Sequence, residues 1–213
     1  MSESLFGVEP QALSLAPGAA LLRSFALAEA ATLLAGVRQV VARAPFRHLI
    51  TPGGFRMSVA MTNCGAVGWF SDRNGYRYTR CDPLTGHSWP PLPVSFRLVA
   101  AAAAAAAGFR GYAPDVCLIN CYEPGSRLSL HQDRNERNDE APIVSVSLGL
   151  PAVFLFGGLK RSEPCSRMPL QHGDVVVWGG PARMRFHGVL PIAEGQHPEL
   201  GTRRISLTFR TAL

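Results

Sequence analysis

His131 and Asp133 are separated by a single residue and come after the strand-like run 115–122 and the turn Glu123-Pro124-Gly125. In an extended chain, side chains two positions apart point to the same side, so an imidazole nitrogen and a carboxylate oxygen reach one point. One more histidine from a distant strand would complete a set of two histidines and one carboxylate, which leaves open coordination positions and suits non-heme Fe(II). Chance and loop hydrogen bonding also produce His-x-Asp pairs, so this pair is weak evidence by itself.

Two later histidines are candidates for the third ligand. His172 lies in the segment 171–174, whose Gly-Asp pair is typical of a turn that enters a strand, and we expect it to be structural. His187 lies in the run 184–189, where a buried imidazole needs a hydrogen-bonding or metal partner. His187 is therefore the preferred third ligand. The alternative is that His187 is a structural histidine, in the core or at its rim, whose ring nitrogens are hydrogen-bonded by other protein groups.

The run 203–210 alternates polar and apolar side chains and places Arg204 and Arg210 on one face. Guanidinium groups bind carboxylates in a bidentate manner, so two of them on one strand can hold a small dicarboxylate. Asn120 and Tyr122 have the same parity on the strand expected before His131 and can donate to the same ligand. The alternative is an amphipathic edge strand.

Residues 65–78 combine glycine, aromatic and basic side chains, with Asn74-Gly75 between two aromatic pairs. This pattern predicts a β-hairpin. Aromatic side chains interleaved with arginine stack on bases and hold phosphates. The alternative is a small aromatic cluster that seals the hairpin.

The chain has 213 residues, enough for one domain, and 47% of them are hydrophobic. A net charge of +6 favours a polyanionic partner such as nucleic acid, although a basic soluble protein is equally compatible. The five cysteines form no CxxC pair, and the first residues contain Glu3 and Glu9 but no early Lys or Arg. We therefore expect reduced thiols in the cytoplasm. The longest apolar run, 98–107, is too short to span a bilayer.

The remaining patterns predict two helices and many short strands. Apolar residues at a spacing of 3.6 predict a helix over 27–44, capped by Ser24, and an alanine-rich helix over 93–107 is ended by Gly108. Strands are expected at 19–22, 58–62, 115–122, 143–150, 152–156, 174–178, 184–189 and 204–210. The fold class is α+β, mainly β, as a sandwich or barrel such as a jelly roll.

Together, these motifs resemble the AlkB family of Fe(II)- and 2-oxoglutarate-dependent dioxygenases, and its bacterial members most closely. The likeness covers nearly the whole chain and includes His131-x-Asp133, His187 and the spaced pair Arg204 and Arg210. Further matching stretches are TPGG at 51–54, MSVAMTNCG at 57–65, LIN at 118–120, APIVSVSLGLP at 141–151, FGGLKR at 156–161 and HGDVVVWGG at 172–180.

The resemblance implies a double-stranded β-helix within one structural domain. Residues 1–48 would form an N-terminal helical extension, 49–92 a nucleotide-recognition lid, and 93–213 the catalytic core. His131, Asp133 and His187 would bind Fe(II). The residues implied for 2-oxoglutarate are Asn120, Tyr122, Arg204, Ser206 and Arg210. The residues implied for the damaged nucleic acid, with Trp69 and His131 enclosing the base, are Thr51, Met61, Trp69, Tyr76, Arg127, Asn135, Ser145, Arg161 and Trp178.

The activity implied by the family is oxidative dealkylation of bases such as 1-methyladenine and 3-methylcytosine. 2-Oxoglutarate and O2 are consumed, and succinate, CO2 and formaldehyde are released. Single- or double-stranded DNA, and RNA as a further candidate, would be the partner of a monomeric enzyme. Asn135 stands where an acidic residue usually lies, which affects lesion preference, and Ser206 replaces a usual asparagine. The alternatives are a dioxygenase of the same fold with a protein or small-molecule substrate, and a non-catalytic nucleic-acid-binding module.

Overall fold

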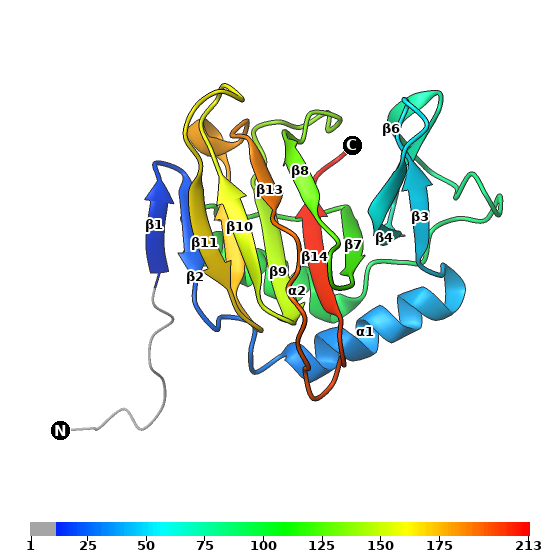
Figure 1. Ribbon diagram of the computed structural model, residues 1–213, viewed down its shortest axis with the longest axis horizontal. Helices are drawn as coiled ribbons and strands as arrows, with labels where there is room; N and C mark the ends of the chain where they lie inside the picture. The colour runs from blue at the N-terminus through cyan, green and yellow to red at the C-terminus, as the bar shows by residue number, and fades with distance from the viewer. Residues whose placement is uncertain (1–11) are drawn as a thin grey trace.

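The computed structural model describes residues 12–213, and the expectation for the first residues, around Glu3 and Glu9, lies outside them. Two β-sheets face each other, with two helices on the outer side of the larger sheet (Figure 1). The larger sheet has, in spatial order, β1 (Ala12–Ala16), β2 (Ala19–Leu22), β12 (Val175–Trp178), β9 (Ile143–Gly149), β14 (Arg204–Arg210), β7 (Val116–Tyr122), β4 (Arg56–Gly65) and β3 (Arg47–Ile50).

The smaller sheet consists of β11 (Ser166–Leu170), β10 (Ala152–Phe156), β13 (His187–Val189) and β8 (Leu128–His131). A separate hairpin pairs β5 (Gly68–Asp72) with β6 (Gly75–Thr79) beside β3 and β4 (Figure 1). Every paired strand is antiparallel, which matches the expected jelly roll of the double-stranded β-helix type.

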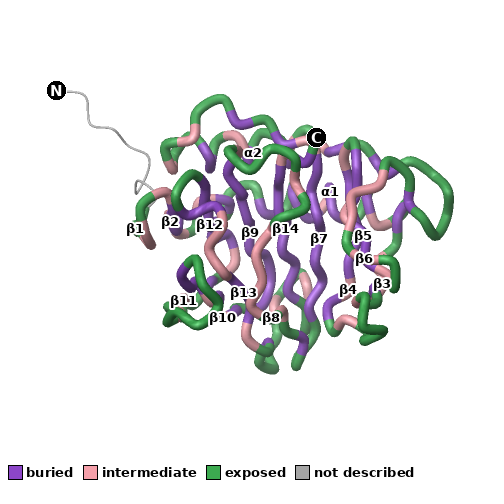
Figure 2. The backbone as a smooth tube through the Cα atoms, turned by 90° about the horizontal axis from the view of Figure 1, so that it is seen from above, coloured by how far each residue is buried: buried purple, intermediate pink, exposed green. Residues whose placement is uncertain are grey.

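Two hydrophobic cores lie on the two faces of the larger sheet. Helices α1 (Ala30–Arg43) and α2 (Val94–Ala106) cover the outer face, where Phe96 meets Phe209 edge to face with ring centroids 5.8 Å apart. The second core fills the space between the sheets. The central strands β9, β14 and β7 are buried along their length, while exposed segments gather in the loops (Figure 2).

The alternation along β14 determines which side chains reach the space between the sheets. Ile205, Leu207 and Phe209 belong to the core beneath the helices. The side chains of opposite parity, which include Arg204 and Arg210, therefore point toward the smaller sheet. Because β14 lies between β9 and β7, the alternative of an edge strand is wrong.

The first helix is confirmed, but its expected start is wrong. It begins at Ala30, and Glu29 rather than Ser24 is its N-cap. Ser24 has φ = +52°, and its backbone N–H donates to Asp174 Oδ1 at 2.8 Å. Asp174 therefore holds the turn before the helix, which leaves Ser24 outside it. The second helix is confirmed, with Pro93 before it and Gly108 after it at φ = +92°.

Most expected strands are confirmed, with one clear difference at 184–189. β13 begins only at His187, because the preceding residues form the 3-10 helix η1 (Gly180–Ala182) and a turn. The strands β1, β3, β8 and β11 were not among the expected strands. β11 contains Pro169, which an edge strand tolerates because it has no partner on one side. None of the described helices is long and apolar enough to cross a membrane.

The hairpin expected at Asn74-Gly75 is also confirmed. Asp72 pairs with Gly75, so Arg73 and Asn74 form the two-residue loop, and Gly75 has φ = +116°. This positive φ explains the glycine, because a Cβ atom would strain the backbone there.

Candidate active site

Three potential ligands converge at one end of the smaller sheet. His131 closes β8, Asp133 follows it, and His187 opens β13, with their ligand atoms all within 4.8 Å of one another. His131 and His187 are direct partners across the β8–β13 pair, which brings two residues far apart in the sequence into contact. Asp133 lies 3.7 Å from His131 Nε2 and 3.8 Å from His187 Nε2.

Backbone carbonyls orient both imidazoles for metal binding. His131 Nδ1 lies 2.8 Å from the carbonyl of Ser129, and His187 Nδ1 lies 3.1 Å from that of Arg185. Because a carbonyl can only accept, each Nδ1 carries the proton and each Nε2 presents a lone pair. The two free nitrogens and the carboxylate match the two-histidine, one-carboxylate set that suits Fe(II).

Burial and neighbouring charges keep this set in its metal-binding form. Burial and the nearby His131 lower the pKa of His187 to about 3, so His187 stays neutral. Burial alone would raise the pKa of Asp133, but Arg210, His187 and His131 hold it below its usual range. At neutral pH the site therefore offers a neutral His187 imidazole and an ionised carboxylate.

The inward face of β14 carries buried cations with unused donors. Arg204 is 1% exposed and lies with its guanidinium 4.9 Å from the ring centroid of Tyr122. Its Nη2 donates to Ser147 Oγ at 3.0 Å, but its Nε and Nη1 have no partner among the described residues. Arg210 Nη1 and Asn120 Oδ1 are also buried without a partner in that part of the chain. Buried donors without a partner are costly, so the unpaired nitrogens of Arg204 and Arg210 are suited to hold an anionic ligand, whereas Asn120 Oδ1 can only accept.

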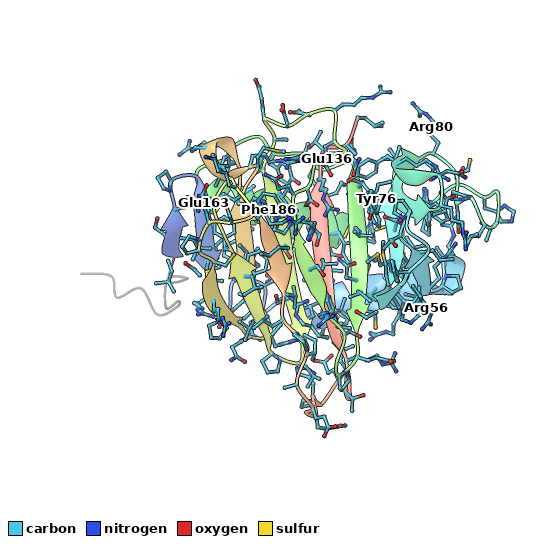
Figure 3. The ribbon with its side chains drawn as sticks, turned by 45° about the horizontal axis from the view of Figure 1, so that its top comes forward. Arg56, Tyr76, Arg80, Glu136, Glu163 and Phe186 are labelled. Atoms are coloured by element: carbon cyan, nitrogen blue, oxygen red, sulfur yellow. The ribbon has the colours of Figure 1, made fainter. Side chains whose placement is uncertain are left out.

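The ligand set and the cations line a single cavity with a volume of about 970 Å³. Every residue predicted for the site lines it: Thr51, Met61, Trp69, Tyr76, Asn120, Tyr122, Arg127, His131, Asp133, Asn135, Ser145, Arg161, Trp178, His187, Arg204, Ser206 and Arg210. Tyr76 and Phe186, which also lines the cavity, are labelled on opposite sides of β14 in Figure 3.

Aromatic rings from several elements line the cavity. Trp69 and Tyr76 stack at a centroid distance of 5.6 Å and an interplanar angle of 16°. Trp178 is buried 4.8 Å from the ring of His187, and its Nε1 has no partner among the described residues. Deeper in the cavity, Ser145 Oγ and Ser206 Oγ share a hydrogen bond of 3.1 Å.

Polar side chains occupy the outer part of the cavity. Arg161 lies 4.9 Å from the ring centroid of Phe186 and donates to the carbonyl of Leu130 at 2.6 Å. Thr51 Oγ1 accepts from the backbone N–H of Phe55 at 3.1 Å. Arg127 and Asn135 are exposed, which leaves their polar groups accessible to a ligand.

Sequence reasoning missed a buried network behind the ligands. Glu136 accepts a hydrogen bond from Tyr78 at 2.6 Å and lies 3.1 Å from Arg183 and 3.4 Å from Arg210. Glu136 lies in the polar run 132–140, where nothing in the sequence distinguishes it from exposed neighbours. Only the tertiary structure shows that its side chain is 3% exposed.

Comparisons with known proteins agree with this geometry. Residues 18–210 match the 2OG-Fe(II) oxygenase superfamily. The chain is 57% identical to the alpha-ketoglutarate-dependent dioxygenase AlkB of Salmonella typhimurium, over 93% of this chain and 92% of that protein. It is 53% identical to the protein of the same name from Escherichia coli, over 96% of this chain and 94% of that one.

A comparison with solved structures finds the same fold in a protein of lower sequence identity. The structure of OsALKBH1 superposes with a TM-score of 0.83 and 28% identity, covering 94% of this chain and all of that one. The identities to both bacterial proteins extend over nearly their full length, and the three ligand positions are intact. The chain therefore belongs to the AlkB family and is an Fe(II)- and 2-oxoglutarate-dependent dioxygenase.

Proposed function

We propose that this dioxygenase repairs nucleic acids by removing N-alkyl groups from damaged bases, such as 1-methyladenine and 3-methylcytosine. The observation that carries the proposal is the single cavity that combines an iron ligand set, unpaired arginine donors and a stacked aromatic pair. A metalloenzyme for a small soluble substrate has no need for the aromatic pair and exposed arginines at the outer part of the cavity. Those features support a base attached to a phosphate backbone.

His131, Asp133 and His187 would hold Fe(II), and the iron with 2-oxoglutarate and O2 would supply the oxidation of the alkyl carbon. Arg204 and Arg210 would bind the two carboxylates of the cosubstrate through donors that are otherwise unpaired. Asn120, Tyr122 and Ser206 line the same part of the cavity and would complete its polar contacts. The protein thus contributes ligand geometry and charge pairing.

The base would have to leave the nucleic-acid stack to reach the metal, at a cost of a few kcal/mol in a duplex. Trp69 on the hairpin and His131 on β8 would enclose it, with Met61, Ser145 and Trp178 around it. Alkylation of a pairing nitrogen already weakens the base pair, so damaged bases leave the stack more easily. This supports single- or double-stranded DNA, and RNA as a further candidate, as substrates.

The contacts outside the base would involve the nucleic-acid backbone. Thr51, Tyr76, Arg127, Arg161 and Asn135 lie toward the outer part of the cavity, and the net charge of +6 favours a polyanion. Residues 49–92, which contain the hairpin, would act as the recognition lid. Residues 1–48 and 93–213 would be the extension and the catalytic core.

Two further properties complete the proposal. We propose a monomeric enzyme, because this chain by itself carries the complete iron ligand set and both inward-facing arginines. All five cysteines are free, including Cys64 and Cys117, which are direct partners on neighbouring strands. Free thiols in such close positions support a reducing compartment, the cytoplasm.

The test is formaldehyde release from an oligonucleotide containing 1-methyladenine, with Fe(II), 2-oxoglutarate and ascorbate. The wild-type protein should release one formaldehyde per repaired base, and His131→Ala should release none while keeping its fold. An unmodified oligonucleotide of the same sequence is the substrate control. Turnover of 2-oxoglutarate that no alkylated DNA or RNA stimulates would contradict the proposal and favour a protein or small-molecule substrate.

A further inference from the structure

Glu136 is a buried carboxylate beside the candidate active site, and it does not line the cavity. Its Oε1 accepts a hydrogen bond from the hydroxyl of Tyr78 at 2.6 Å, and its Oε2 lies 3.1 Å from Arg183 Nη2. Arg210 Nε lies 3.4 Å from Oε1. The partners come from β6, from the residue after η1, and from β14. Figure 3 labels Glu136 beside the end of β14.

Arg210 is shared between Glu136 and Asp133. Its Nε and Nη2 lie 2.9 and 2.8 Å from Asp133 Oδ2, on the carboxylate that belongs to the metal-ligand set. Arg183 donates to the backbone carbonyl of Asp133 at 2.9 Å, so both arginines contact the same residue. The cluster therefore contains two buried cations, Arg183 and Arg210, and two carboxylates, Asp133 and Glu136.

We propose that Glu136 is a positioning residue that pairs with Arg183 and shares Arg210, so that Asp133 remains available to the metal, while Tyr78 ties this cluster to the β5–β6 hairpin. The inference rests on the proposed function, because it takes Asp133 as an iron ligand. It assigns a role to Glu136, Arg183 and Tyr78, which belong neither to the ligand set nor to the pair proposed for the cosubstrate.

The charges around Glu136 determine whether its replacement strengthens or weakens metal binding. Glutamine at position 136 would leave two cations facing the carboxylate of Asp133 as the only anion of the cluster. Arg210 would then compete more strongly with the metal for Asp133, and the excess positive charge would repel a divalent cation. Both effects weaken metal binding, and burial strengthens them because the charges are poorly screened.

The effect at Tyr78 is of another kind, since its hydroxyl contributes a hydrogen bond but no charge. Burial raises the pKa of Tyr78, so the phenol keeps its proton and donates to Glu136. Tyr78→Phe should leave the metal affinity within twofold of wild type. It should instead loosen the hairpin, because this contact joins β6 to the segment that follows β8.

The test is titration calorimetry of Mn(II), a redox-inert probe, into metal-free protein. E136Q should raise the Mn(II) dissociation constant at least tenfold, equivalent to about 1.4 kcal/mol. The double variant E136Q/R183M removes one charge of each sign and should recover much of the affinity. R183M alone removes one cation from the cluster and should bind Mn(II) more tightly than wild type. If E136Q does not fold, the Mn(II) affinity of R183M tests the proposal in its place.

Hydrogen exchange of the amides in residues 68–79 tests the link to the hairpin. Y78F should raise their exchange rates at least threefold and raise the KM for the alkylated oligonucleotide. Y112F is the matched control, because the hydroxyl of Tyr112 is buried without a partner among the described residues. It should match wild type in both measurements.

The outcomes separate this inference from the proposed function. If wild-type protein binds no Mn(II), the proposed iron site fails. If wild type binds Mn(II) and E136Q binds it equally well, or if the double variant shows no recovery, the role of Glu136 is wrong. Hairpin exchange in Y78F equal to that in Y112F would overturn the role of Tyr78.

Discussion

Arg204 shows at the scale of one residue why the cavity requires an anionic ligand. Its guanidinium is fully buried, and two of its nitrogens have no partner among the described residues. Burial also lowers the pKa of Arg204, since the charged form loses its solvation. A carboxylate bound there would satisfy the unpaired donors and the charge together, so the free protein carries an energetic cost that the cosubstrate removes.

Replacing Arg204 with lysine should therefore raise the KM for 2-oxoglutarate more than it lowers kcat. Lysine keeps the charge but loses the planar pair of donors, and a lost charged hydrogen bond costs about 1.5–3 kcal/mol, or roughly 10- to 150-fold in affinity. The measurement is succinate formation against 2-oxoglutarate concentration. Arg203→Lys, at the exposed neighbouring position, is the control and should leave the KM unchanged. An unchanged KM in Arg204→Lys would exclude this arginine from cosubstrate binding.

At the scale of elements, the site could be predicted wherever strand alternation determines direction. The parity of β14 and β7 predicts one shared side for Arg204, Arg210, Asn120 and Tyr122, and all four line the cavity. Glu136 could not be predicted, because its burial depends on Tyr78 and Arg183, which lie in distant elements. The shortened β13 and the edge strand β11 were missed for the same reason, since tertiary contacts rather than local pattern define their limits.

Gly65, which ends β4, should be more sensitive to substitution than a glycine in an open turn. It has φ = +126°, and an added Cβ would lie 2.2 Å from the backbone oxygen of Asp115 on the neighbouring chain segment. Gly75 has φ = +116° but would place its Cβ in open space. The positive φ costs about 1–3 kcal/mol for a non-glycine residue in either case. The steric overlap adds to this cost at Gly65 alone.

Gly65→Ala should thus lower the urea midpoint of unfolding clearly more than Gly75→Ala does. Both variants should keep the same m-value as wild type, since the surface exposed on unfolding does not change. Equal midpoints for the two variants would show that the backbone at Gly65 moves away from Asp115 at little cost.

At the scale of the whole molecule, most of the architecture was open to prediction because β-rich segments and turn signals alternate throughout the second half of the chain. The exact strand order was beyond prediction, since it depends on pairings between remote segments such as β12 with β2.

One remote contact joins the turn before β12 to β9. His172 Nδ1 accepts a hydrogen bond from the backbone N–H of Gly149 at 2.9 Å, which confirms the structural role expected for His172.

This contact predicts how the stability of the metal-free protein changes with pH. Burial and the nearby His197 lower the pKa of His172, so the unfolded chain binds a proton more readily than the folded protein does. The contribution of His172 is fully present above the unfolded pKa of about 6.5 and is lost as the pH falls below it. A protonated Nδ1 also cannot accept from Gly149.

His172→Asn removes this titration while keeping an acceptor for Gly149. The fall in the urea midpoint between pH 7.5 and pH 5.5 should be smaller in His172→Asn than in wild type. His87→Asn, at an exposed position, should keep the wild-type slope. A slope in His172→Asn as steep as that of wild type would assign the pH dependence to other groups.

The division of labour between the two sheets has a consequence for substrate size. The histidines that would hold iron belong to β8 and β13, whereas Arg204 and Arg210 extend from β14 on the opposite sheet. Arg210 contacts Asp133 directly, so the distance between the sheets at Arg204 sets the reach from the metal to the second guanidinium. A dicarboxylate one methylene shorter or longer than 2-oxoglutarate would therefore fit one end of the site poorly. Side chains that pack between the sheets, such as Phe154, set this distance.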